Sequence, residues 1–135
     1  MLKPVLIDSN ILIDIFSNND EWFQWSRDQL TMLSQQTQLF INPIIYTEIS
    51  IGFEKIEELE NTLNLLPIKN REIPKEALFL AGKAFLKYRK NNGAKSAPLP
   101  DFYIGAHGAV EGWSIITRDP RRMKYYYPGL DVISP

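Results

Sequence analysis

The apolar residues of this chain change repeatedly between two spacings, and this alternation constrains the fold more than any other feature. Apolar spacings of three and four, together with residues that favour helix starts, predict helices at about 9–16, 20–38, 42–48, 54–66, 73–90 and 100–111. Short apolar runs, typical of buried strands, lie between the helices at Val5–Ile7, Leu39–Ile41, Trp113–Thr117 and Val132–Ile133. Strands and helices that alternate in this way predict an α/β fold.

The residue types that the chain lacks exclude several kinds of site. Its 135 residues suffice for one compact domain, and we expect a single domain over residues 1–135. The absence of cysteine excludes disulfides, cysteine-bound metals and thiol catalysis, and a lone histidine, His107, excludes multi-histidine metal sites. Because no basic segment followed by an apolar one opens the chain, we expect a cytoplasmic protein with no membrane partner.

Four acidic residues lie where an α/β sheet places its ligands. Asp8 directly follows the first predicted strand, and Asp119 follows the strand that ends at Thr117. Glu48 lies in the second turn of the helix after the second strand, and Asp101 begins a helix after a predicted loop over 93–100. The carboxyl ends of parallel strands form the ligand crevice of such folds, so we expect these four acids to lie close together.

A group of carboxylates without cysteine or paired histidines suits Mg²⁺ or Mn²⁺, which prefer oxygen ligands and often bind substrate phosphates. Such a site favours the hydrolysis of phosphate esters. The neutral amide of Asn10 lies two residues after Asp8 and could help to hold a water without adding negative charge. Taken singly, each acid could instead be a helix cap or a solvated helix residue.

Four segments, in this order and spacing, resemble the PIN-domain ribonucleases and, within them, the VapC-type toxins of bacterial type II toxin–antitoxin systems. The resemblance covers nearly the whole chain. Its segments are Leu6–Asp14, Asn42–Ile49, Leu99–His107 and Ile115–Arg122.

This resemblance implies a three-layer α/β/α fold around a parallel sheet of about five strands. It implies that Asp8, Glu48, Asp101 and Asp119 are the catalytic and metal-binding acids, with Asn10 and Thr117 in support. It also implies an endoribonuclease that depends on Mg²⁺ or Mn²⁺, acts on tRNA or another structured RNA, forms a homodimer and is held inactive by a cognate antitoxin.

The formal net charge of −1 conceals two halves of opposite charge. Residues 1–72 carry −6 and residues 73–135 carry +5. The positive residues that flank Asp101 and Asp119 are candidates for binding an RNA backbone, and Tyr125–Tyr127 could stack on bases. The RNA-binding candidates are Lys95, Arg118, Arg121 and Arg122. A solvated surface is the alternative for these side chains.

Other functions remain open on the sequence alone. A haloacid-dehalogenase-type phosphatase would need an acid two residues after Asp8, where this chain has Asn10. A PIN nuclease outside a toxin–antitoxin system and a non-catalytic RNA- or protein-binding module are further alternatives.

For three residue types near the predicted site, we expect structural rather than catalytic roles. His107 lies about 240° around its helix from Asp101, so we expect it to pack rather than to catalyse. Asp14 lies four residues after Asn10 and could support the site from behind its ligands, but we expect a surface acid of the helix. The glycines at 105 and 108 leave a helix face that admits close packing or a substrate.

Overall fold

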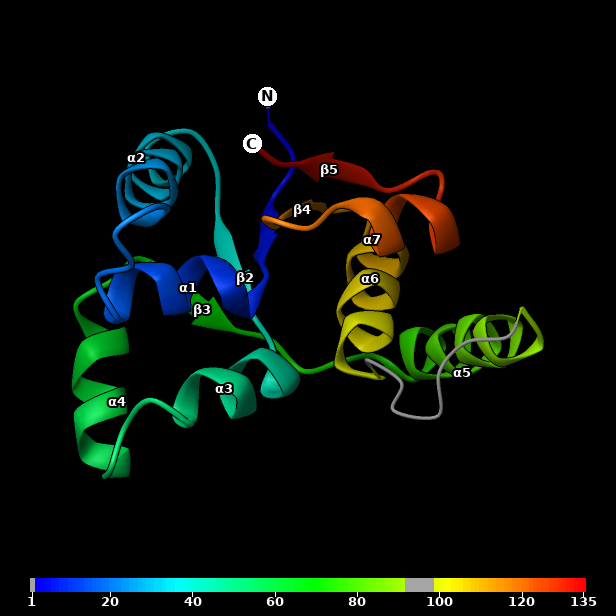
Figure 1. Cartoon of the computed structure of the whole chain (residues 1–135), viewed down its shortest axis with the longest axis horizontal. Coiled ribbons are helices and arrows are strands. Elements are labelled where there is room, and N and C mark those ends of the chain that lie inside the picture. The colour runs from blue at the N-terminus through cyan, green and yellow to red at the C-terminus, as the bar shows by residue number, and fades with distance from the viewer. Residues whose placement is uncertain (1, 92–98) are drawn as a thin grey trace.

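The computed structural model describes residues 2–91 and 99–135 of the chain (Figure 1). Lys95 and most of the predicted loop over 93–100 lie outside these residues.

A parallel sheet forms the centre of the fold. Its strand order is β3-β2-β1-β4-β5, and every neighbouring pair is parallel. Val5 at the start of the central strand is in register with Leu39 and with Ser114. The five strands are β1 (Val5–Ile7), β2 (Leu39–Ile41), β3 (Ile68–Asn70), β4 (Ser114–Ile116) and β5 (Asp131–Ile133). The α/β prediction with about five parallel strands is therefore confirmed.

Helices cover both sides of this sheet. Figure 1 shows α1 and α2 on one side of the central strands and α5 and α6 on the other. The helices of the described chain are α1 (Ser9–Phe16), α2 (Phe23–Ser34), α3 (Pro43–Ser50), α4 (Ile56–Asn64), α5 (Lys75–Lys90), α6 (Leu99–Glu111) and α7 (Arg121–Tyr126). Within residues 2–91 and 99–135, we find no helix long and apolar enough to cross a bilayer.

The structure differs from the sequence prediction at three elements. The helix predicted over 20–38 is shorter at both ends. At its start, Asn19 accepts hydrogen bonds from the amides of the turn before Phe23, and at its end residues 35–37 form turn hydrogen bonds. Strand β3 was missed because two of its three residues, Lys69 and Asn70, are exposed polar residues at the sheet edge. Helix α7 was missed because its six residues, rich in charge, bury only Met123.

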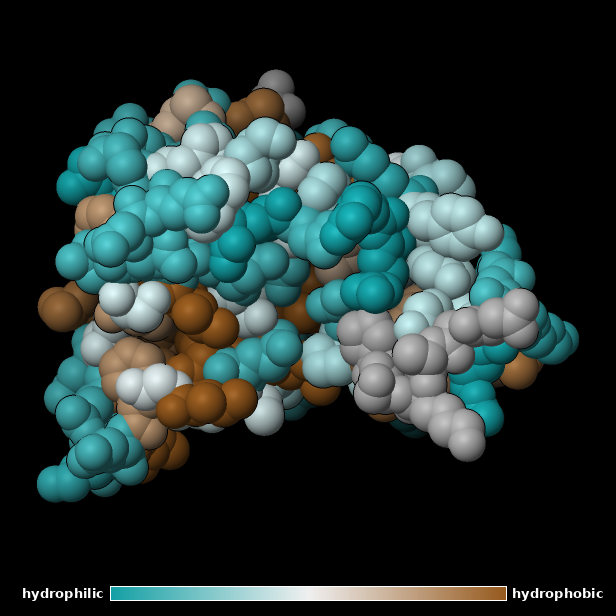
Figure 2. Space-filling model, in the orientation of Figure 1, coloured by the Kyte–Doolittle hydropathy of each residue, from teal (hydrophilic) through white to brown (hydrophobic). Residues whose placement is uncertain are grey.

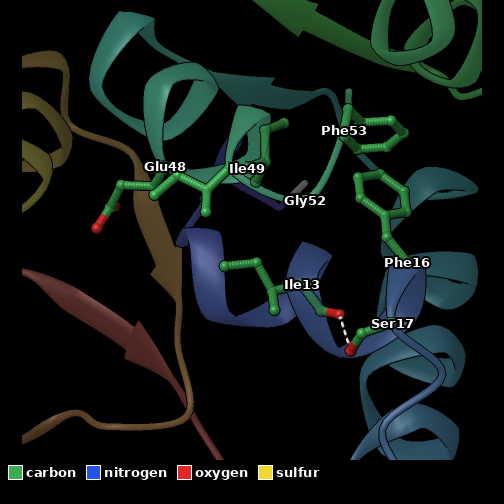
Figure 3. Close-up of a pocket in the computed structure, with 8 residues that line it drawn as sticks. Ile13, Phe16, Ser17, Glu48, Ile49, Gly52 and Phe53 are labelled. Atoms are coloured by element: carbon green, nitrogen blue, oxygen red, sulfur yellow. Dashed lines mark hydrogen bonds between the residues drawn. The ribbon is translucent and has the colours of Figure 1, made fainter. Parts of the chain in front are cut away.

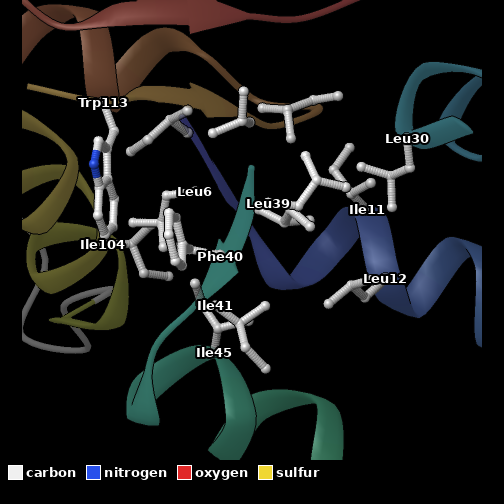
Figure 4. Close-up of a cluster of buried hydrophobic side chains, with 14 of the residues drawn as sticks. Leu6, Ile11, Leu12, Leu30, Leu39, Phe40, Ile41, Ile45, Ile104 and Trp113 are labelled. Carbon is white, nitrogen blue, oxygen red and sulfur yellow. The ribbon is translucent and has the colours of Figure 1, made fainter. Parts of the chain in front are cut away.

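The core is built on the three inner strands, whose residues are all buried. The Phe40 ring stacks on Trp113 with centroids 4.5 Å apart and planes 9° apart (Figure 4). His107 is fully buried against Trp113, and its Nδ1 lies 3.1 Å from the Asn42 side-chain amide. Burial, aided by the charge of Arg71, lowers the pKa of His107 to about 4. These contacts confirm its packing role.

Close packing also explains the glycines of α6. A Cβ on Gly105 would overlap the Tyr127 ring and lie 2.9 Å from the sulfur of Met123. A Cβ on Gly108 would lie 2.9 Å from Ile115. The face that they share is therefore a packing surface, against which α7 and β4 rest, and it is closed to a substrate.

We predict that Gly105→Ala lowers the free energy of unfolding by about 1–3 kcal/mol, because the methyl group overpacks the α6–α7 contact. Gly82→Ala is the matched control: it is also inside a helix, but its Cβ would meet nothing within 4 Å. That control is expected to raise the free energy of unfolding by about 0.5–1 kcal/mol. Urea denaturation measures both, and equal effects would contradict the packing account.

Candidate functional site

The predicted acids lie around the carboxyl ends of the inner strands. Asp8 immediately follows β1 and is the N-cap of α1. Asn42 follows β2 and caps α3 by accepting a 2.9 Å hydrogen bond from the Ile45 amide, and this helix start carries Glu48 into its second turn. The helix α6 begins at the same end of the sheet and has Asp101 in its first turn.

Asp8 is the most buried acid of the site, with 5% of its surface exposed. Its Oδ1 accepts the backbone amide of Ser9 at 2.7 Å, and its Oδ2 accepts the hydroxyl of Thr117 at 2.7 Å. Burial is the main cause that raises the pKa of Asp8 to about 6; the charges of Asp101 and Glu48 add to it, and the Thr117 hydrogen bond opposes it. The buried Asp8 carboxylate therefore lies close enough to Asp101 and Glu48 to be repelled by both.

Glu48 and Asp101 show the same mutual repulsion. Burial, followed by the charge of Asp101, raises the pKa of Glu48 above its ordinary value, although the Ser9 hydroxyl donates to Glu48 Oε1 at 2.8 Å. Burial is also the main cause that raises the pKa of Asp101, and the charge of Asp119 contributes. Asp8, Glu48 and Asp101 thus lie within range of one another's charges, and Asp119 lies within range of Asp101.

Arginine side chains hold two of these acids. The Nη1 of Arg122 lies 2.7 Å from Asp101 Oδ2, and the Nε of Arg121 lies 3.1 Å from Asp119 Oδ1. The hydrogen bond from Arg121 lowers the pKa of Asp119, which is more exposed than the other acids. Within the described part of the chain, no three acidic side chains converge closely enough, as they stand, to hold a metal ion.

The donor set nevertheless fits a hard divalent cation. Every candidate ligand is a carboxylate oxygen. Burial first, and the charges of neighbouring acids second, raise the pKa values of Asp8, Glu48 and Asp101, and a bound cation would offset both costs. Two of the four acids, Asp101 and Asp119, are instead paired with arginine, while Asp8 and Glu48 accept hydrogen bonds from Ser9 and Thr117.

Asn10 and Thr117 link α1 to the segment after β4. The Asn10 amide donates to Thr117 Oγ1 at 3.2 Å, and its oxygen accepts the Arg118 backbone amide at 3.3 Å. Thr117 Oγ1 also accepts the Asp119 backbone amide at 3.2 Å. These bonds position Asp8 and Asp119 relative to each other.

The contact of Ser9 with Glu48 was not predicted from the sequence. The signal that could have indicated it is a hydroxyl residue directly after the acid that ends the first strand.

Comparison with known proteins decides the family. The family model of the PIN domain matches residues 5–127. The chain belongs to the PIN-domain family. Metal-dependent nuclease activity is a general property of that family. The family resemblance inferred from the four sequence segments is confirmed. No curated protein sequence matches the chain.

Solved structures with the same fold come from toxin–antitoxin complexes. This PIN domain is similar to a chain of a toxin–antitoxin complex from Klebsiella pneumoniae, with 25% identity, 97% of each chain covered and a TM-score of 0.70. It is also similar to a chain of VapBC2 from Rickettsia felis bound to a DNA fragment from their promoter, with 15% identity, 98% of each chain covered and a TM-score of 0.75. A chain of VapBC-1 from nontypeable Haemophilus influenzae has 16% identity, 97% coverage of each chain and a TM-score of 0.73.

The surface position expected for Asp14 in this PIN domain is wrong. Only 1% of Asp14 is exposed, because α2 packs over α1 and places the Ser26 hydroxyl 3.0 Å from Asp14 Oδ2. The Nε of Arg118 lies 2.7 Å from the same oxygen, and the Arg118 guanidinium lies 5.7 Å from the centre of the Trp22 ring. Arg118 therefore has a fixed partner inside the protein, and its role in RNA binding stays a prediction.

The three consecutive tyrosines of the PIN domain are not equivalent. Tyr127 is buried, and its hydroxyl donates to the Phe102 carbonyl at 2.8 Å. The expectation that Tyr127 stacks on bases is therefore wrong, because the ring fills the space above Gly105. Tyr125 is 60% exposed, so its stacking on RNA stays a prediction.

An apolar groove of about 310 Å³ adjoins Glu48 on the surface of the PIN domain. In Figure 3, the side chains of Ile13, Phe16 and Phe53 surround the groove and the Glu48 carboxylate points away from it. Ile13 is 41% exposed and Ile51, which also lines the groove, is 85% exposed. Figure 2 shows hydrophobic surface gathered where α1 and α3 lie.

We predict that Asp8→Asn stabilises the metal-free protein at neutral pH by about 1–3 kcal/mol. The pKa of Asp8 in the folded protein, about 6, lies above its ordinary value of 3.8, so ionisation of the carboxyl favours unfolding. The gain should therefore be absent below pH 3.8, grow between 3.8 and about 6, and be complete above that value. Denaturation in EDTA across this range measures it.

The control for this prediction is Asp14→Asn, which also neutralises a buried acid of α1. This substitution removes the partner of Arg118 and should lower the free energy of unfolding. A destabilising effect of Asp8→Asn at neutral pH, similar to that of Asp14→Asn, would contradict the account of charge repulsion at the site.

Proposed function

We propose that this chain is a metal-dependent endoribonuclease and the toxin of a type II toxin–antitoxin pair. The whole of residues 1–135 would form one nuclease domain, with Mg²⁺ or Mn²⁺ as its cofactor. The observation that carries the proposal is the buried Asp8 carboxylate, whose pKa of about 6 reflects burial and the charges of Asp101 and Glu48. Membership of a family of nucleases supports the same conclusion.

The proposed metal ligands are Asp8, Glu48, Asp101 and Asp119. When bound, a divalent cation would supply a Lewis acid for the hydrolysis of a phosphodiester bond. Asn10 and Thr117 would keep the Asp8 carboxylate fixed through their hydrogen bonds to its Oδ2, 3.4 Å and 2.7 Å long. Ser9 would hold Glu48 at the rim of the site through its 2.8 Å hydrogen bond.

The proposed RNA substrate would bind beside α7. Arg121 and Arg122 lie at the start of this helix, next to two of the proposed ligands, and the exposed Tyr125 follows them. Arginine binds phosphate oxygens with two parallel hydrogen bonds, and exposed aromatic rings stack on unpaired bases. Lys95 and Arg118 remain RNA-binding candidates from the sequence alone.

The proposed protein partners are a second copy of the chain and a cognate antitoxin. The similar structures from Klebsiella pneumoniae, Rickettsia felis and Haemophilus influenzae are toxin–antitoxin complexes, which supports an antitoxin for this chain. We place the antitoxin on the apolar groove beside Glu48. Its exposed Ile13 and Ile51 would be covered there, and a segment bound in this position would also obstruct the acidic site.

We predict that the purified protein cleaves RNA when Mg²⁺ or Mn²⁺ is present and that Asp101→Asn lowers the rate by at least about 100-fold, through loss of a metal ligand. The matched control is Asp28→Asn, which removes an equal charge from an exposed position on α2. Gel analysis of a labelled RNA, with circular dichroism to check folding, measures the effect. Metal-independent cleavage, or full activity of Asp101→Asn, would contradict the metal-site proposal.

A cellular experiment separates the toxin from a PIN nuclease of another pathway. Expression of the chain should arrest growth, and co-expression of the small reading frame next to its gene should relieve the arrest. Asp101→Asn should not arrest growth. Normal growth despite RNA cleavage in vitro would exclude the toxin role and leave a nuclease with another substrate.

A further inference from the structure

We propose that Arg122 is a displaceable counter-charge of the acidic site, which pairs with Asp101 in the metal-free protein and with an RNA phosphate once metal is bound. This inference rests on the proposed function. It adds a coupling that the function alone does not require. Metal binding would free Arg122 for an RNA phosphate, and RNA binding would free Asp101 for the metal.

The arginines next to Asp119 differ in how firmly they are held. Arg118 is 31% exposed, but its partner Asp14 is only 1% exposed and is also bonded to Ser26, so the carboxylate of that pair is fixed in the interior. The Arg121–Asp119 pair lies in water, with side chains 88% and 55% exposed, and contributes little. Arg122 and Asp101 are intermediate, at 33% and 32%, with a short separation of 2.7 Å. Arg122 is therefore the arginine that is both well paired and able to move.

The ion pair of Arg122 matters for metal binding because its partner, Asp101, is one of the proposed ligands. Asp101 raises the pKa of both Asp8 and Glu48 by its charge, so it belongs to the group of mutually repelling carboxylates. Arg122 contacts Asp101 Oδ2, an oxygen that a divalent cation would also use. Both positive groups cannot take the same lone pairs, so Arg122 has to leave that oxygen when a cation takes it.

The structure does not need this ion pair to hold α7 in place. Met123 and Tyr127 already pack on α6 at Gly105, and the Tyr127 hydroxyl bonds to the Phe102 carbonyl. After release from Asp101, the Arg122 guanidinium would remain beside the site, one-third exposed and near Asp119, whose carboxylate already accepts hydrogen bonds from Arg121. A phosphodiester oxygen is the ligand that its planar donors match. By linkage, a bound phosphate that draws Arg122 away should strengthen metal binding by the same factor.

The first test is Mn²⁺ binding, followed by electron paramagnetic resonance in the absence of RNA. Arg122→Gln should tighten Mn²⁺ binding by about threefold to tenfold relative to Lys124→Gln. Lys124 is the matched control because it is an exposed cation of the same helix, so its removal changes the net charge equally. Equal affinities of the two variants would overturn the inference and leave the nuclease proposal standing. Failure of the wild-type protein to bind Mn²⁺ would overturn both.

The second test uses RNA binding without metal, so that it is independent of activity. Fluorescence anisotropy in EDTA would measure binding of a labelled single-stranded RNA oligonucleotide. Asp101→Asn should tighten binding at least about threefold more than Asp8→Asn, which removes an equal charge that is not paired with arginine. Adding Arg122→Gln should abolish that extra gain. An equal gain from both acids, or a gain that survives Arg122→Gln, would overturn the inference.

Discussion

The proposed function depends on the repulsion among carboxylates that the fold holds together at one end of its sheet. Asp8 is buried directly after the central strand, and Glu48 and Asp101 lie near enough to raise its pKa further. Such an arrangement costs stability unless a cation is present. The hydrogen bonds from Ser9 and Thr117 and the ion pair with Arg122 reduce this cost in the metal-free protein.

Short polar links connect this group of acids to the rest of the fold. Asn10 and Thr117 join α1 to the segment after β4, and the ion pair of the buried Asp14 with the partly exposed Arg118 joins the same two segments. Changes at Asp14 would therefore reach the acidic site although Asp14 is not among its proposed ligands. The apolar groove beside Glu48 begins on α1 as well, so a partner bound there would contact an element that positions Asp8.

The sequence was informative where a single local pattern determined the structure. The uniformly apolar runs at Val5–Ile7 and Leu39–Ile41 predicted inner strands, and the acids after them marked the ligand end of the sheet. Pairing between distant segments was not predictable in the same way. The burial of Asp14 depends on how α2 crosses α1, and the bond from Arg122 to Asp101 spans 21 residues. No local spacing contains either fact.

The central claim is that acids from four segments of the chain bind one divalent cation site. A crystal structure of the protein with Mn²⁺, located by its anomalous scattering, tests this claim most directly. The account predicts Mn²⁺ bonded to an Asp8 oxygen, with Asp101 or Glu48 as a further ligand and Arg122 turned away from Asp101. Mn²⁺ bound elsewhere, with the Arg122–Asp101 pair intact and the four acids empty at saturating metal, would contradict it.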